Sequence, residues 1–280
     1  MSAYRFCRTD DIGLLVDALN RCWAPYFPDE PPMTPAAFKR SIRDLQVWCS
    51  SCMVAFAGPD PIGILIGAKR TSGTLIHKVA VHPDHRRQGH GRHLLTSLGS
   101  KLAILGPPRI VAEVPETLDA ACALFETAGY DLEAVLTDYV LHPSNRTEAA
   151  DHFAIPVTVD DLVANGLLGS DAPQTCWKRS IETLNAQKDD IAGLGVASDE
   201  RIEAFILYVK ETEIAAIRSL VDDGGARLRQ LLAQLRATRG ATTLTFPKVH
   251  ATEISKELLE TLGFRPSGRH RLYATKARSQ

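Results

Sequence analysis

A short basic loop that contains glycines is the part of this sequence whose residue types are best suited to chemistry. The loop follows an apolar strand pattern at residues 75–81, begins at Pro83, and contains Arg86, Gly89 and Gly91 before a helical pattern starts. Glycine lets the backbone approach a ligand closely. The first turn of a helix presents unpaired N–H groups and the positive end of the helix dipole, and arginine adds bidentate hydrogen bonds. These features predict a site for a phosphate-bearing ligand.

Two common phosphate-binding motifs do not fit this loop. A Walker A motif requires a Lys-Ser/Thr pair after its second glycine, and Arg92-His93 stands there instead. A dinucleotide fingerprint requires a third glycine and an acidic residue about 20 residues later, and neither is in the right place. The remaining alternative is a glycine-rich turn that binds nothing.

The pattern Val81-x-Pro83-x-x-Arg86-x-x-Gly89-x-Gly91 resembles motif A of the GCN5-related N-acetyltransferases (GNATs). This resemblance implies acetyl-CoA, or another acyl-CoA, as cofactor, with its pyrophosphate bound by the amides of the loop. It also implies that the strand before the loop diverges from its neighbour and that its free amides bind the pantetheine arm and the thioester carbonyl. The cofactor-binding residues that we expect are Val79, Ala80, Val81, Arg86, Arg87, Gln88, Gly89, His90, Gly91, Arg92 and Phe125.

Two side chains are candidates for the base that removes a proton from the attacking amine. Residues 111–114, Val-Ala-Glu-Val, resemble the Leu-Glu-Val of N-terminal and ribosomal-protein acetyltransferases, which implies that Glu113 is the base. A solvated charge on a strand is the alternative. His77 lies on the strand before the loop, and the pKa of a histidine suits proton transfer near neutral pH, although a histidine there can instead line the pocket.

The sequence departs from the family pattern at the position of the general acid. Phe125 stands where the family has a tyrosine, and Leu118 where it has an asparagine. Phenylalanine cannot donate a proton, so Tyr130, Tyr139 or a water molecule takes this role, or the thiolate leaves unaided because a thiol has a pKa of about 8.5. Of these, Tyr130 joins Glu113 and His77 as the third expected catalytic residue.

The family resemblance implies that the loop between the first two helices forms the wall of the acceptor site. Its aromatic and acidic residues are Trp23, Tyr26, Phe27, Asp29 and Glu30. They suit a cationic amine through cation–π and Coulomb interactions. An ordinary core edge with solvated charges is the alternative.

These residues predict an N-acyltransferase that moves an acetyl or other short acyl group from coenzyme A to a primary amine. No cysteine stands at a recognisable nucleophile position, so we expect direct attack in a ternary complex. We expect a small-molecule amine as acceptor, and a protein-lysine or N-terminal acetyltransferase would differ only in its acceptor. A catalytically lapsed coenzyme A-binding sensor or scaffold is the alternative from another class.

The composition is that of a globular protein with two domains of ordinary size. The chain has 280 residues, of which 45% are hydrophobic and 23% charged, and a formal net charge of −1. This charge gives no general attraction to nucleic acid or to an anionic membrane. No apolar run reaches the ~18–20 residues of a membrane span, and no signal-peptide pattern opens the chain, so we expect a cytoplasmic protein. A monomer or a homodimer is the expected oligomeric state.

The cysteines and histidines predict neither redox chemistry nor a metal site. The six cysteines are scattered through the chain, which argues against a disulfide framework. Cys49-x-x-Cys52 has thioredoxin-type spacing, but a strand pattern follows it instead of a helix, so we expect buried thiols. The histidines at 82, 85, 90 and 93 are interrupted by the glycines of the loop, and we expect no metal ligands among them.

Hydrophobic periodicity predicts the elements that position these residues. In the first half they are strand 4–7, helices 12–23 and 34–45, a hairpin of strands 54–57 and 62–68, strand 75–81, a helix from the loop to about 105, strand 109–114, helix 118–128 and strand 135–141. This is the order of elements in the GNAT fold.

The second half repeats part of the first. Residues 124–130 match residues 258–264 at an offset of 134, which indicates a duplication; two unrelated α/β halves that share a helix C-cap are the alternative. At the position of the loop the second half has Asp222-Asp223-Gly224-Gly225, whose carboxylates would repel a pyrophosphate. We therefore expect one cofactor site, in the first half.

The expected fold is a pair of tandem GNAT-like α/β domains, each a twisted, mostly antiparallel sheet flanked by helices. The expected domains are 1–143, with the acyl-CoA site, and 151–280, which is degenerate, joined by a linker at 144–150.

Overall fold

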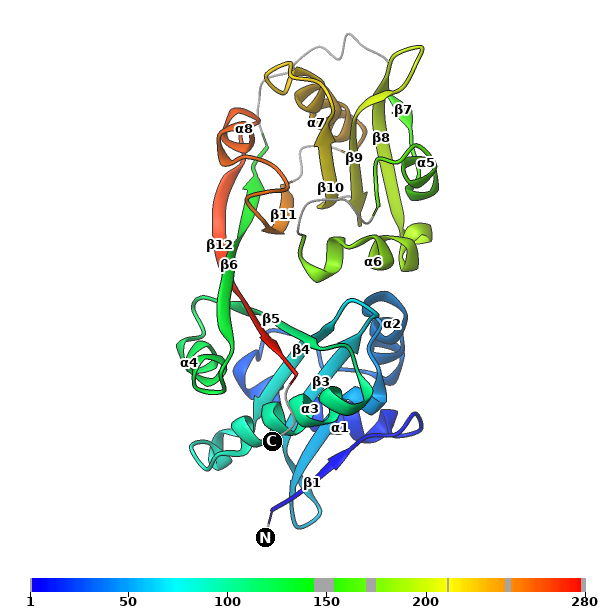
Figure 1. The fold of residues 1–280 in the computed structure, drawn as a ribbon. Helices are drawn as coiled ribbons and strands as arrows, with labels where there is room; N and C mark the ends of the chain where they lie inside the picture. The colour runs from blue at the N-terminus through cyan, green and yellow to red at the C-terminus, as the bar shows by residue number, and fades with distance from the viewer. Residues whose placement is uncertain (1, 144–153, 170–174, 211, 240–242, 278–280) are drawn as a thin grey trace. The chain divides into compact units, whose positions relative to one another are not determined.

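The computed structural model describes residues 2–143, 154–169, 175–210, 212–239 and 243–277 (Figure 1). The chain forms two units: unit 1 comprises Met1–Ala134 and Arg271–Gln280, and unit 2 comprises Val135–His270. Each unit is a sheet flanked by helices, as expected. The expected linker at 144–150 lies outside the described residues.

Unit 1 is built on a sheet that is antiparallel at one end. Its strands are β1 (Ser2–Phe6), β2 (Met53–Ala57), β3 (Asp60–Lys69), β4 (Thr74–Val81), β5 (Arg109–Pro115) and parts of β6 (Asp131–Leu141) and β12 (Arg265–Lys276). β1 to β4 pair antiparallel in sequence order, and β5 then runs parallel to β4. β12 stands between β5 and β6 in the strand order.

Amphipathic helices cover this sheet. They are α1 (Ile12–Cys22), α2 (Pro35–Leu45), α3 (His90–Leu105) and α4 (Asp119–Thr127). The Thr34 side chain caps α2 by accepting a hydrogen bond from the amide of Ala37 (3.1 Å), as Thr-Pro at a helix start predicts. α3 buries Leu94, Leu95, Leu98 and Leu102 in the core of unit 1, and this spacing is that of one helix face.

Unit 2 repeats this arrangement. Its elements are β7 (Ile155–Pro156), α5 (Val159–Ala164), α6 (Ile181–Ala186), β8 (Ile191–Ala197), β9 (Ile202–Val209), β10 (Glu213–Ser219), α7 (Ala226–Arg239), β11 (Leu244–Val249) and α8 (Lys256–Thr261). Left-handed glycines stand at matching places: Gly129 (φ 82°) and Gly263 (φ 90°) follow α4 and α8, and Gly89 (φ 84°) and Gly225 (φ 80°) precede α3 and α7. The counterpart of Gly89 is thus Gly225 and not Asp223, to which the offset of 134 points.

Two strands, β6 and β12, are each divided between the two units. Residues 131–134 of β6 belong to unit 1 and the rest of that strand to unit 2, whereas residues 271–276 of β12 return to unit 1. Tyr273 is fully buried in the core of unit 1, and the amide of Ala277 donates to the carbonyl of Pro108 (2.5 Å). The units therefore differ from the contiguous domains expected from the sequence, because strand alternation does not specify which sheet a strand joins.

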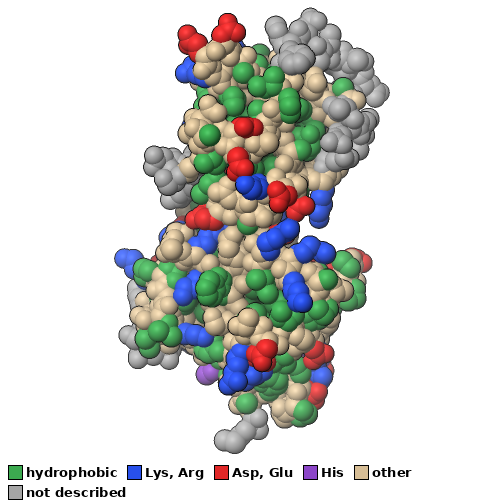
Figure 2. All heavy atoms as spheres, turned by 90° about the vertical axis from the view of Figure 1, so that its right-hand side faces the viewer, with side chains coloured by type: hydrophobic (Ala, Val, Ile, Leu, Met, Phe, Trp, Pro, Cys, Tyr) green, Lys and Arg blue, Asp and Glu red, His purple; other side chains and the backbone are tan. Residues whose placement is uncertain are grey.

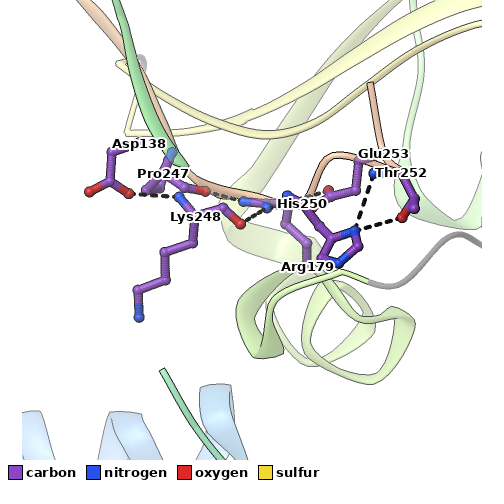
Figure 3. Close-up of polar contacts among 7 residues, drawn as sticks. All are labelled: Asp138, Arg179, Pro247, Lys248, His250, Thr252 and Glu253. Carbon is purple, nitrogen blue, oxygen red and sulfur yellow. Dashed lines mark hydrogen bonds and ion pairs between the residues drawn. The ribbon is translucent and has the colours of Figure 1, made fainter. Parts of the chain in front are cut away.

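A buried ion pair supports β11 in unit 2 (Figure 3). The guanidinium of Arg179 donates to both carboxylate oxygens of Glu253 (2.7 and 2.8 Å), and only 4% and 10% of these two side chains are exposed. It also donates to the carbonyls of Pro247 and Lys248, where β11 leaves its register with β6. Arg179 thus satisfies carbonyls at the point where the strand ladder is interrupted.

The cysteine thiols are all free and buried, as expected. Burial raises the pKa of Cys7 to about 12 and that of Cys22 to about 11, which disfavours the nucleophilic thiolate. In the described part of the chain, no group of three or more His, Cys, Asp or Glu is arranged to hold a metal ion. No helix there is long and apolar enough to cross a membrane. Charged side chains of both signs are scattered over the face shown in Figure 2, in line with the small net charge.

Candidate functional site

The predicted phosphate loop connects β4 to α3 in unit 1. After Val81 the amide of His82 still donates to the carbonyl of Ile62 (2.8 Å), and Pro83–His85 forms a 3-10 turn. Gly89 is the N-cap of α3 and has a left-handed φ of 84°. A Cβ on Gly89 would meet no atom within 4 Å, so the backbone conformation, and not a lack of space, favours glycine here.

The amides that open α3 are available to a ligand. The first backbone hydrogen bond of the helix is accepted by the carbonyl of Gly89 (3.0 Å). Among the hydrogen bonds of the described residues, none involves the amides of residues 87–92, as expected for a helix start without a side-chain cap. Three exposed arginines flank these amides, at 86, 87 and 92. Unpaired N–H groups, the helix dipole and the arginines together suit an anion.

The neighbouring strands β4 and β5 pair only at one end. Their parallel register is confined to Thr74 with Ile110 and Leu75 with Val111, although both strands continue well beyond these pairs. The divergence that the resemblance implies is therefore present, and it lies on the side of β4 that leads to the phosphate loop.

The backbone of β4 directs two residues toward this diverging side. Because His82 pairs with Ile62 by hydrogen bonding, strand alternation turns the polar backbone groups of Ala80 toward β3 and those of Val79 and Val81 toward β5. In agreement, the carbonyl of Val81 accepts a hydrogen bond from the Tyr26 hydroxyl (2.6 Å) instead of a β3 partner. The polar backbone groups of Val79 and Val81 are thus turned away from β3, whereas those of Ala80 are used within the sheet, and the expected contact of Val79 and Val81 with a ligand stays a prediction.

His77 and Glu113 occupy different strand environments. The β3–β4 register passes from Ile66 opposite Lys78 to Gly67 opposite Ile76, so His77 is an extra residue in a β-bulge. Such bulges re-aim side chains and are common beside active sites. Glu113 lies on β5 between the buried residues 112 and 114, and both candidate bases are half-buried. Their roles stay predictions.

The two tyrosine candidates for the acid, Tyr130 and Tyr139, lie in hydrophobic cores, and Phe125 packs beside Tyr130. Phe125 and Tyr130 are buried in unit 1 with their rings 5.1 Å apart, edge to face. Burial raises the pKa of Tyr130, which keeps its phenol protonated. Tyr139 packs in the core of unit 2, so it does not belong to the unit that carries the loop.

The expected acceptor wall is fastened to β4 by a residue that the sequence analysis missed. The ammonium of Lys78 lies 4.0 Å from the ring centroid of Trp23 and 3.3 Å from a carboxylate oxygen of Glu30, which also accepts from the Trp23 indole N–H (3.0 Å). Phe27 stacks on Trp23 at 4.4 Å, whereas Asp29 is exposed. Burial lowers the pKa of Lys78 although Glu30 opposes this. A single basic residue within an apolar strand pattern is the signal that could have revealed it.

A second missed residue, Tyr4, contacts the start of α3. Its hydroxyl lies 2.6 Å from Nδ1 of His90, and its ring is 3.8 Å from that of His93. His90 is only 5% exposed, and its Nε2 has no hydrogen-bond partner among the described residues. Burial, assisted by the nearby histidines, lowers the pKa of His90. His90 therefore supports the loop as a neutral ring and adds no positive charge.

His90 should make the folded state sensitive to acid. Because its pKa is lower in the folded than in the unfolded chain, the unfolded chain binds more protons as the pH falls below about 6.5, and the free energy of unfolding decreases. His90→Gln retains an acceptor for Tyr4 and should lose less stability than wild type between pH 7.5 and 5.5. Urea denaturation at both pH values measures this difference, and equal losses in the two proteins would contradict it.

In unit 2 a side chain of the protein occupies the start of the corresponding helix. The carboxylate of Asp223 accepts hydrogen bonds from the amides of Gly225 (2.9 Å), Ala226 (3.1 Å) and Arg227 (3.0 Å), and from the Arg227 guanidinium (2.9 Å). Although burial opposes it, these hydrogen bonds hold the pKa of Asp223 below its ordinary value. The amides that are unpaired before α3 are therefore capped before α7, which supports the prediction of one site for a more specific reason than repulsion.

Comparisons with known proteins relate this chain to a family of acetyltransferases. Residues 14–130 match the family model described as Acetyltransferase (GNAT) family. The [ribosomal protein bS18]-alanine N-acetyltransferase of Escherichia coli (strain K12) is 32% identical over 84 residues, which are 30% of this chain and 56% of that protein. The chain thus spans about half the length of the curated relatives it matches.

Solved structures resemble the whole chain, and two of them serve as examples. A GCN5-related N-acetyltransferase from Sphaerobacter thermophilus matches with a TM-score of 0.68 at 13% identity. The match covers 99% of this chain and 96% of that protein's chain. A tandem GNAT protein from the clavulanic acid biosynthesis pathway has a TM-score of 0.65 at 14% identity, with 100% of both chains covered. At these identities the likeness concerns the fold, and it confirms the expected tandem arrangement.

Proposed function

This chain belongs to the acetyltransferase (GNAT) family through residues 14–130, and from that premise we propose that it transfers an acetyl or other short acyl group from coenzyme A to a primary amine. One observation carries the proposal: the unpaired amides at the start of α3 lie at the end of the strand that diverges from β5. A helix start of this kind suits a pyrophosphate, and a free strand edge suits an extended amide-containing arm.

The residues present fit an acyl-CoA. The amides of the phosphate loop, with Arg86 and its neighbouring arginines, would hold the pyrophosphate, and the backbone of Val79 and Val81 would contact the pantetheine arm. The bound cofactor supplies the acyl group as an activated thioester. The protein has to orient the amine and accept its proton, for which Glu113 and His77 are the candidates. Since the cysteines are buried, direct attack by the amine is the proposed route.

The acceptor is either a small-molecule amine or the N-terminal amine of a protein. The aromatic loop fastened by Lys78 offers a wall for a small amine. The 32% identity to a ribosomal-protein alanine N-acetyltransferase favours a protein N-terminus as the second candidate.

A turnover assay tests the proposal. Purified protein is mixed with acetyl-CoA and, in separate reactions, a polyamine, an amino sugar, a peptide with N-terminal alanine and an N-blocked lysine peptide. Thiol release is followed with a chromogenic disulfide, and the product is identified by mass spectrometry. Acylation of any one amine supports an enzyme and names its acceptor class. Binding of acetyl-CoA without thiol release in every reaction would support the sensor alternative instead.

Lys78→Met is expected to raise the KM for the amine about fivefold to thirtyfold, because the cation–π contact and the ion pair that fasten the acceptor loop are each worth about 0.5–1 kcal/mol, or about 1–2 kcal/mol together. The KM for acetyl-CoA should not change. Lys39→Met removes the same charge from an exposed position on α2 and serves as the control. Equal KM values for the two variants would show that the fastening does not shape the acceptor site.

A further inference from the structure

The C-terminal part of β12 contacts the end of helix α4 in unit 1. In the last turn of the helix, the ring of Tyr273 stacks on that of Phe125, with centroids 5.7 Å apart and planes 12° apart. At its end, the hydroxyl of Thr275 donates to the carbonyl of Gly129 (3.1 Å). These contacts come from residues that follow unit 2 in the chain and belong to unit 1 in the fold.

A polar network joins the same strand to the residue that follows β5 and to the last turn of α4. The Tyr273 hydroxyl donates to a carboxylate oxygen of Glu126 (2.7 Å), next to Phe125 in α4. Arg271 pairs with that same oxygen (3.2 Å) and with the carboxylate of Glu116 (3.5 Å) just after β5. Burial raises the pKa of Tyr273 to about 12, so its hydroxyl stays protonated and remains a donor.

This network lies close in sequence to two residues of the proposed site. Glu116 follows Glu113 on the same stretch of chain, and Glu126 follows Phe125, which is fully buried and cannot itself form a polar contact through its side chain. Among the described contacts, the side chain of Tyr273 both packs on Phe125 and pairs with its neighbour Glu126.

We propose that Tyr273 is a positioning residue for the proposed acyl-transfer site, and that the C-terminal strand segment 271–277 is required to hold α4 and the end of β5 in their active arrangement. The inference rests on the proposed function for its kinetic consequence only. In the second half of the chain, Asp223 caps the helix that corresponds to α3, so no ligand site is expected there. The inference gives this half a structural role, because it ends in the strand segment that completes unit 1.

The test compares Tyr273→Leu with Tyr208→Leu, which removes a buried tyrosine from the core of unit 2. Tyr273→Leu is expected to lower kcat about tenfold to a hundredfold, the scale of a misplaced catalytic group, with little change in the KM for acetyl-CoA. Tyr208→Leu should leave kcat unchanged. Tyr273→Phe, which keeps the stacked ring but loses the hydrogen bond to Glu126, should recover part of the loss.

Amide hydrogen exchange of the α4 residues keeps the inference separate from the proposed function. Faster exchange in Tyr273→Leu than in Tyr208→Leu supports the positioning role even if no amine is ever acylated. Equal exchange and equal kcat in the two variants would overturn it. If Tyr273→Leu does not fold, Arg271→Met takes its place, because Arg271 is partly exposed and its loss removes the pairs with Glu116 and Glu126 and the hydrogen bond to the Tyr273 hydroxyl (3.4 Å). Unchanged α4 exchange in Arg271→Met would then overturn the inference.

Discussion

Gly89→Glu is expected to weaken acetyl-CoA binding about a hundredfold or more. The substitution places a carboxylate at the N-cap of α3, beside the amides proposed to hold the pyrophosphate. Two like charges about 4 Å apart repel by about 4 kcal/mol at the dielectric effective near a protein surface, which is more than a hundredfold in affinity. Isothermal titration calorimetry with acetyl-CoA measures the change directly.

Two control variants separate charge from backbone strain in that experiment. Gly89→Ala forces a non-glycine residue into the left-handed φ of 84° without adding charge, and it should weaken binding far less. Gly58→Glu adds the same charge at another left-handed glycine (φ 62°), in the turn between β2 and β3. If Gly89→Glu binds acetyl-CoA as tightly as Gly58→Glu does, the loop is not the pyrophosphate site.

Glu113→Gln is expected to lower kcat about 10²- to 10⁴-fold, the usual contribution of a general base, while the KM for acetyl-CoA stays the same. Glutamine keeps the shape of the side chain but cannot accept the proton of the amine. The loss should be present across the pH range in which wild type is active, and the acid limb of the kcat profile should disappear with it. Steady-state kinetics at several pH values, with saturating acetyl-CoA, provides the measurement.

The two candidate bases make opposite predictions. His77→Gln should have a small effect if Glu113 accepts the proton, because His77 then only lines the site from its β-bulge. Full activity in Glu113→Gln together with a large loss in His77→Gln would transfer the role to His77. Near-normal kcat in both variants would exclude both side chains and leave a water molecule as the acceptor of the proton.

The local structure of the predicted phosphate loop was predictable from sequence because its features are local. A strand, a proline, an arginine and two glycines follow one another directly, and the conformation of Gly89 and the unpaired amides after it come from this short stretch alone. The hairpin, α3 and β5 were also predicted close to their observed bounds, since each has a clear hydrophobic period. The left-handed glycines that end α4 and α8 were likewise visible as a repeat.

The support around the loop was not predictable in the same way. In the sequence, Lys78 is one charged residue within an apolar strand pattern. Only its contacts with Trp23 and Glu30 show that it holds the loop after α1, the predicted acceptor wall, against β4. Asp223 reads as a charge that would repel a ligand, and only the structure shows it capping α7. In both cases the partner, and not the residue type, determines what the charge does.

The sequence by itself thus determined the fold, the duplication and the local structure of one strand–loop–helix segment, whose chemistry stays a prediction. The tertiary structure decided which strands complete each unit, where His77 bulges out of register, and which buried ring packs on Phe125. The reason is physical. Residues 125 and 273 lie far apart in the chain, and a strand that alternates buried and exposed side chains can pair with either of two similar sheets, so the choice between them depends on packing that no local pattern encodes.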